Sequence, residues 1–83
     1  MKIDFDGVQA FVMIAELGSF NQAAQALHIT QTALTRRIQK LEAYLDLKLL
    51  DRTTRRVELT AVGREFLPQA RNIVLDMTAA VER

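Results

Sequence analysis

The segment QTALTRRIQKLEAYL, residues 31–45, carries hydrogen-bonding side chains at a helical spacing. At about 100° per residue, one side of a helix here is formed by Gln31, Thr32, Thr35, Arg36 and Gln39, which we call the polar stripe. Amide, hydroxyl and guanidinium groups bind base edges in the major groove of DNA, where Gln pairs with adenine and Arg with guanine. The stripe therefore predicts base contacts; the alternative for each Thr or Gln is an ordinary surface position.

Basic charge is concentrated in the middle third of the chain. Residues 31–60 carry seven Lys or Arg against four Asp or Glu, whereas residues 1–30 carry one against three. Arg37 and Lys40 lie to either side of the polar stripe. We expect them to meet phosphates, which adds affinity without sequence information.

Three further arginines, Arg52, Arg55 and Arg56, cluster just after this segment. Guanidinium groups gathered at one turn repel each other unless an anion lies near them. A phosphate backbone or a narrow minor groove would supply that anion. The alternative is a solvated basic turn paired with Asp51 and Glu58, which stabilises a fold little.

The polar stripe can face outward only if the helix buries its other side. That side is apolar and is formed by Leu34, Ile38, Leu41 and Leu45. Thr30 precedes the helix as an N-cap, and Ile29 stands in staple relation to Leu34. These features predict a helix that begins at a defined point and packs along one face.

A shorter helix is predicted immediately before it. Gly18 can end the preceding helix in a left-handed conformation, and Ser19 with Gln22 forms a capping box. The short connection that follows makes the two helices cross sharply, which is the outline of a helix-turn-helix. Ser19 and Asn21, at the start of the short helix, suit a phosphate; the alternative for Ser19 is a cap alone.

Two short strands are predicted within residues 50–59, followed by a long helix that Thr60 caps. Pro68 predicts a bend in that helix rather than its end. Gly63 costs about 1 kcal/mol relative to Ala in a helix, so we expect another element to pack closely against it.

The long helix has an apolar seam at heptad-like spacing. Its members are Phe66, Leu67, Ala70, Ile73, Val74, Met77, Ala80 and Val81. Such a seam predicts pairing with a second copy of the chain. The alternative is the ordinary buried stripe of a monomer.

Composition excludes several classes of protein. The chain has 83 residues, no cysteine and the single histidine His28, so neither a disulfide framework nor a zinc ligand set is expected. No nucleophile or carboxylate constellation accompanies His28, and we expect no enzyme activity. The sequence lacks a membrane-spanning run and a signal peptide, which favours the cytosol.

Several short motifs occur together over nearly the whole chain. They are Gly18-Ser19-Phe20 with Ala23-Ala24, Leu27-His28, Gln31 followed by Ala33-Leu34-Thr35-Arg36, Leu41-Glu42, Arg52-Thr53, and Leu59-Thr60 with Gly63. In these motifs the chain resembles the N-terminal DNA-binding domain of a LysR-type transcriptional regulator. Two positions depart from the family pattern: Asp46 replaces the usual Gly after the recognition helix, and Leu50 replaces the usual Phe.

The resemblance implies a mainly α fold, a winged helix-turn-helix with a three-helix core plus a β-hairpin wing, followed by a long linker helix. Residues 1–59 would form the DNA-binding domain and residues 60–83 the linker and dimerisation helix. The recognition helix would be residues 31–45 and the wing residues 50–59. Family members also carry a larger C-terminal domain that binds a small-molecule inducer and builds tetramers, and the chain looks like a domain excised from such a protein.

The expected function is sequence-specific binding of a double-stranded DNA operator by a homodimeric bacterial regulator. It would act in the cytoplasm, at the nucleoid, without a cofactor or metal in this domain and without a membrane partner. The alternative is a coiled-coil protein-interaction module whose basic patch is incidental.

Overall fold

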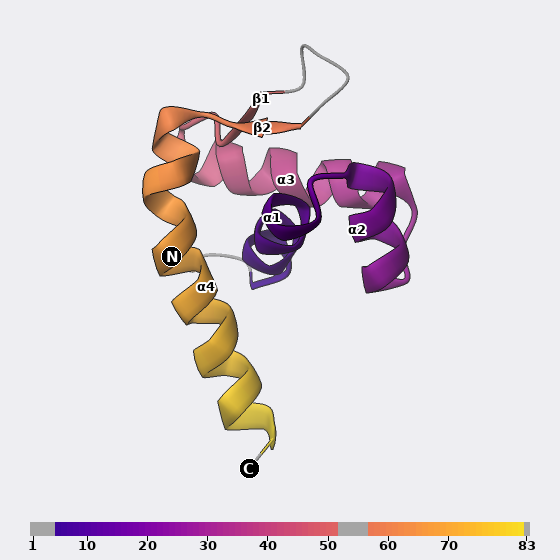
Figure 1. Cartoon of the computed structure of the whole chain (residues 1–83), viewed down its shortest axis with the longest axis vertical. Coiled ribbons are helices and arrows are strands. Elements are labelled where there is room, and N and C mark those ends of the chain that lie inside the picture. Colours follow the sequence, from indigo (N-terminus) through magenta and orange to yellow (C-terminus); the bar gives the residue numbers. More distant parts are fainter. Residues whose placement is uncertain (1–4, 52–56, 83) are drawn as a thin grey trace.

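The computed structural model describes residues 5–51 and 57–82, with side chains as far as residue 76. Its elements in chain order are α1 (Phe5–Leu17), α2 (Phe20–Leu27), α3 (Gln31–Leu45), β1 (Leu50–Asp51), β2 (Glu58–Leu59) and α4 (Ala61–Glu82). Figure 1 shows α1 at the centre, with α2 and α3 beside it and the hairpin on the far side of α3. The predicted mainly α fold, a winged helix-turn-helix followed by a long helix, is confirmed.

The core forms around α1, which packs against all three other helices. Phe11 and Ile14 of α1 are fully buried with Leu34 of α3, and Leu41 is almost completely buried. A Cβ atom at Gly7 would lie 3.1 Å from the Leu41 Cβ, so α1 and α3 cross in close contact. The apolar side predicted for α3 therefore packs inward.

The predicted caps of the helix-turn-helix are confirmed. Gly18 has φ 68°, and the Ser19 Oγ accepts a hydrogen bond from the backbone N–H of Gln22 at 3.1 Å. The Thr30 Oγ1 likewise accepts from the backbone N–H of Ala33 at 3.0 Å. These side chains satisfy N–H groups that a helix start leaves without intrahelical partners.

Two helices end at a residue that has a left-handed backbone conformation but is not glycine. His28 ends α2 at φ 59°, and Asp46 ends α3 at φ 54°. The backbone N–H of Leu47 then donates to the Glu42 carbonyl oxygen at 3.1 Å. Asp46 thus takes the conformation that glycine usually takes after a helix, because Asp tolerates this region better than most residues.

The hairpin is short in the described part of the chain. Leu50 pairs with Leu59 and Asp51 with Glu58 in an antiparallel arrangement. The three arginines predicted for the wing, Arg52, Arg55 and Arg56, lie outside the described residues.

The start of α4 is joined to the chain segment that leads into β1. Thr60 caps α4 by accepting from the backbone N–H of Gly63 at 3.0 Å, and its hydroxyl donates to the Lys48 carbonyl oxygen. A Cβ atom at Gly63 would lie 2.2 Å from the Leu49 carbonyl oxygen. The close packing predicted from Gly63 is confirmed, and α4 continues through Pro68.

The apolar seam of α4 is used largely within its own chain. Ala70 is fully buried, and the Phe66 ring lies 5.7 Å from the Phe11 ring, centroid to centroid. Leu67, Ile73 and Val74 are half-buried and also pack against the core, while the side chains of Met77, Ala80 and Val81 lie outside the described part. Ala70 is buried within its own chain and is therefore not accessible to a partner in this fold, whereas pairing through the rest of the seam stays a prediction.

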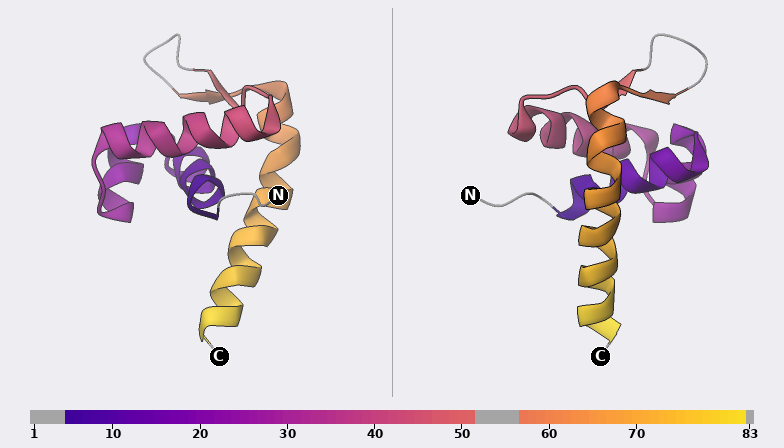
Figure 2. Two further views of the ribbon diagram at one scale, coloured as in Figure 1. Left: turned by 180° about the vertical axis from the view of Figure 1, so that it is seen from behind. Right: turned by 60° about the vertical axis from the view of Figure 1, so that its left-hand side comes forward.

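The far end of α4 lies apart from the core. In both views of Figure 2 its C-terminal part extends beyond the other helices. Leu75 in this part has 64% of its surface exposed. Among the residues that the structure describes, no helix has the length and apolar character needed to cross a membrane.

Candidate nucleic-acid interface

The polar stripe lies on the surface of α3. Gln31, Thr32, Arg36 and Gln39 are exposed, and Thr35 is half-buried. The opposite side of the same helix is held in the core, since Leu34, Ile38 and Leu41 have at most 4% of their surface exposed. A helix anchored on one side and polar on the other can enter a groove without unfolding.

The basic residues beside the stripe differ in their surroundings. Lys40 is exposed, whereas Arg37 is half-buried. In Figures 1 and 2 the hairpin lies along α3 on the side away from α1, so α3 and the hairpin share one end of the molecule. An elongated polyanion could contact both elements at once.

The start of α2 meets the start of α3 through a side-chain hydrogen bond. The Gln31 Nε2 donates to the Asn21 Oδ1 at 3.2 Å. Ser19 is half-buried and its Oγ accepts the capping hydrogen bond, while its contact with a phosphate stays a prediction. The structure thus brings together a predicted phosphate contact, Asn21, and a predicted base contact, Gln31.

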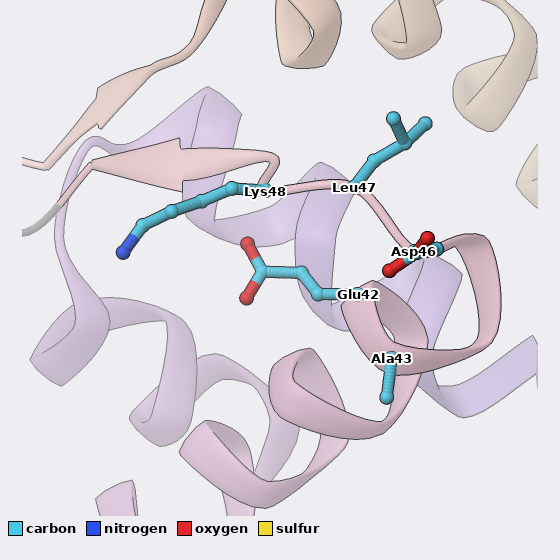
Figure 3. Close-up of a pocket in the computed structure, with 5 residues that line it drawn as sticks. All are labelled: Glu42, Ala43, Asp46, Leu47 and Lys48. Atoms are coloured by element: carbon cyan, nitrogen blue, oxygen red, sulfur yellow. The ribbon is translucent and has the colours of Figure 1, made fainter.

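Glu42 connects α3 to the hairpin. Its Oε2 accepts hydrogen bonds from the backbone N–H of Leu49 at 2.7 Å and from that of Leu50 at 3.2 Å. In Figure 3 the Glu42 carboxylate points from α3 toward the Lys48 segment, while Asp46 lies farther along the chain at the end of the helix. One carboxylate therefore sets how β1 lies against α3, and sequence reasoning missed this role.

Two hollows flank Glu42 and Lys48. One, of about 310 Å³, is lined by Glu42, Ala43, Asp46, Leu47 and Lys48 (Figure 3). The other, of about 150 Å³, is lined by Thr35, Ile38, Gln39, Glu42, Lys48 and Leu50. No three His, Cys, Asp or Glu side chains gather into a metal site in the part of the chain that the structure describes.

Lys48 is a candidate contact that sequence reasoning counted among the basic residues but did not select. It lines the smaller hollow with Thr35 and Gln39, and its side chain is exposed. In Figure 3 the Lys48 side chain extends away from Leu47 and Asp46. Its proximity to Thr35 and Gln39 depends on the fold and could not be read from the sequence.

An ion pair joins α1 to α4. The Arg71 Nε lies 3.2 Å from the Glu16 Oε2, and both side chains are about half exposed. Exposed pairs stabilise a fold by less than about 1 kcal/mol. The Phe11–Phe66 ring contact and the burial of Ala70 in the core, rather than this pair, hold α4 in place.

Comparison with known protein families matches most of the chain to one family. Residues 5–64 match the family model of bacterial regulatory helix-turn-helix proteins of the LysR type. The chain belongs to the LysR family. It is 51% identical over 74 residues, 89% of its length, to the uncharacterized HTH-type transcriptional regulator YbhD of Escherichia coli strain K12, of which it spans 23%.

Two solved structures of protein–DNA complexes share the fold. The crystal structure of the BenM_DBD/catB site 1 DNA complex matches with a TM-score of 0.88 at 34% identity, covering 95% of this chain and 88% of that one. The crystal structure of Vibrio fischeri DarR in complex with DNA matches with a TM-score of 0.90 at 33% identity, covering 99% of this chain and 28% of that one. The likeness to this LysR fold extends through α4.

Proposed function

We propose that this LysR-family domain binds double-stranded DNA in a sequence-specific manner, as part of a bacterial transcriptional regulator. The observation that carries the proposal is the polar stripe, which lies exposed on α3 while the opposite side of the helix is buried. Two structurally similar proteins, BenM_DBD and DarR, were solved as complexes with DNA. These likenesses favour DNA binding over a protein-interaction module with an incidental basic patch.

In this proposal the side chains divide into two groups. Gln31, Thr32, Thr35, Arg36 and Gln39 contact bases, because they carry the donors and acceptors that distinguish base pairs. The remaining groups contact the backbone or the minor groove and are Ser19, Asn21, Arg37, Lys40, Lys48, Arg52, Arg55 and Arg56. Binding needs neither a cofactor nor a metal in this domain, and no reaction is catalysed.

Arg36 and Lys40 give the test of this division. Arg36→Ala weakens binding to a selected site by about tenfold and reduces discrimination against a site with one changed base pair, because a bidentate guanine contact is lost. Lys40→Ala weakens binding to all sequences alike and lowers the salt slope by about 1, because one phosphate contact is lost. Titration of labelled duplexes at several salt concentrations measures both quantities.

Arg71→Ala is the matched control, since it removes an exposed guanidinium from α4. It leaves affinity and discrimination close to those of the wild type. If Arg36→Ala behaves like Arg71→Ala, α3 is not the recognition helix.

We also propose that the domain pairs with a second copy through α4. Ala70 is excluded from the contact because it is buried in its own chain, so the exposed apolar surface of α4 that includes Leu75 is the candidate. A dimer places two recognition helices on two half-sites about one turn of DNA apart. In the full-length protein an inducer-binding domain and tetramer formation would lie outside this chain, and the protein would act at DNA in the cytoplasm.

Sedimentation equilibrium tests the dimer. We expect the wild-type chain to be dimeric at micromolar concentration, and Leu75→Glu to weaken dimerisation by about tenfold or more, because a charge is desolvated at the contact. Gln69→Glu adds the same charge at an exposed position on another side of α4, six residues before Leu75, and is the control. A wild-type monomer, with and without DNA, would contradict dimerisation through α4.

A further inference from the structure

The hydrogen bond between Asn21 and Gln31 lies where the proposed interface begins. Gln31 is the first residue of α3 and Asn21 is the second residue of α2, ten positions earlier. The two amides come together because the caps at Ser19 and Thr30 set where each helix starts. Neither residue is buried, so the bond is not needed to satisfy a polar group in the core.

The bond has a direction that affects what Gln31 can offer a base. The Gln31 Nε2 donates and the Asn21 Oδ1 accepts. A glutamine amide has two N–H donors and one carbonyl oxygen, so one N–H and the Oε1 remain on Gln31. This pair of one donor and one acceptor complements adenine, which presents N7 as an acceptor and N6–H₂ as a donor in the major groove.

We propose that Asn21 is a positioning residue that holds the Gln31 amide in the orientation selecting adenine. The proposal rests on the proposed function, in which Gln31 contacts a base. With the amide reversed, Gln31 would present two N–H donors, which suit the two acceptors O6 and N7 of guanine. If Asn21 holds one orientation of the amide, Gln31 can pair with adenine but not with guanine.

Exposure to water makes the Asn21–Gln31 hydrogen bond weaker in the free domain than in the complex with DNA. Both amides are exposed, so in the free domain water competes for the same donors and acceptors. When DNA covers the start of α3, water is excluded and an unpaired donor or acceptor becomes costly. Because the bond to Asn21 leaves Gln31 one N–H and the Oε1, adenine is the base that pairs with both of these groups.

Selection from a pool of random double-stranded DNA measures the effect directly. The wild-type chain, Gln31→Ala, Asn21→Ala and the control Asn72→Ala are each used to select bound duplexes, and the base preference at every position is compared. We expect one position per half-site to prefer adenine in the wild type and to lose that preference in Gln31→Ala. Asn21→Ala reduces the adenine preference at the same position by about three- to tenfold and leaves the other positions unchanged.

Competing roles for Asn21 give different results. If Asn21 contacted only a phosphate, Asn21→Ala would weaken all sequences alike and leave the base preferences intact, which would overturn the proposal. A guanine preference at the Gln31 position in the wild type would also overturn it, because the amide would then be reversed. Thermal unfolding checks that Asn21→Ala is folded, which we expect because Asn21 is exposed and alanine favours a helix.

The double variant Asn21→Ala/Gln31→Ala separates positioning from an independent contact. If Asn21 acts through Gln31, the double variant shows the same base preferences as Gln31→Ala alone. A further change of preference at the Gln31 position would show that Asn21 contacts that base itself, contrary to the proposal. Failure of the proposed function is distinct, since the wild-type chain would then select no sequence at all.

Discussion

Replacing Gly63 with alanine lowers the free energy of unfolding by about 3 kcal/mol, because the new methyl group overpacks a tight contact. Its Cβ would lie 2.2 Å from the Leu49 carbonyl oxygen, which is a backbone atom and cannot move by a change of side-chain rotamer. The same oxygen accepts the backbone N–H of Thr60 at 3.0 Å, so moving it also weakens that bond. Thermal unfolding should show a fall in Tm of about 12 °C or more for a domain of this size.

Gly18→Ala is the control that separates packing from backbone conformation. Gly18 has φ 68°, but no atom of another part of the chain lies within 4 Å of the place that an alanine Cβ would take. Alanine at this position is destabilising only because its Cβ atom disfavours the left-handed conformation, by about 1 kcal/mol. We therefore expect Gly63→Ala to be the more destabilising by a clear margin. If the two substitutions cost the same, α4 does not approach the Leu49 backbone as closely as described.

Glu42→Ala is the second substitution with a large expected effect. It removes the acceptor for the backbone N–H groups of Leu49 and Leu50, two residues whose surfaces are at most 2% exposed. Leaving buried donors unpaired costs about 1–3 kcal/mol, so we expect a loss of about 2 kcal/mol in the free energy of unfolding. Denaturant titration measures it.

DNA binding gives a second measurement on Glu42. We expect Glu42→Ala to weaken binding to all sequences alike, because β1 loses its attachment to α3 while the polar stripe is unchanged. Glu42→Gln removes the same negative charge but keeps a side-chain oxygen as an acceptor, so the difference between the two variants isolates the hydrogen bonds.

Glu65→Ala, at an exposed position of α4, controls for the loss of a surface carboxylate. If Glu42→Ala is as stable as Glu65→Ala, the attachment of β1 does not depend on this side chain. If Glu42→Ala also changes base preference, Glu42 acts on the recognition helix as well as on the hairpin.

Local sequence features predicted the elements of the fold well. The caps at Ser19 and Thr30 act within three residues along the chain, and the end of α1 at Gly18 depends on one residue's φ. The inward and outward sides of α3 follow from helical periodicity. These signals could be recognised without knowing how the elements pack, because each depends on neighbours in the sequence.

The candidate interface was predicted in part. The exposure of Gln31, Thr32, Arg36 and Gln39 agrees with the polar stripe, whereas their contacts with bases stay a prediction. Lys48 was not selected, since nothing in the sequence indicates that the chain after α3 turns back to share a hollow with Thr35 and Gln39. That turn depends on the left-handed conformation of Asp46, which a non-glycine residue signals only weakly.

Only the tertiary structure decided the contacts between elements distant along the chain. A heptad-like seam on α4 has the same pattern whether it packs on a second copy or on α1, and the buried Ala70 shows which applies at that position. The Asn21–Gln31 and Glu42–Leu49 hydrogen bonds likewise depend on how the helices and the hairpin pack against one another. The sequence by itself determined which residues form each helix and which side of it is polar, because those properties are local. The packing of α1, α3, α4 and the hairpin decided which of those sides contact one another, because the burial of a residue depends on all of these elements at once.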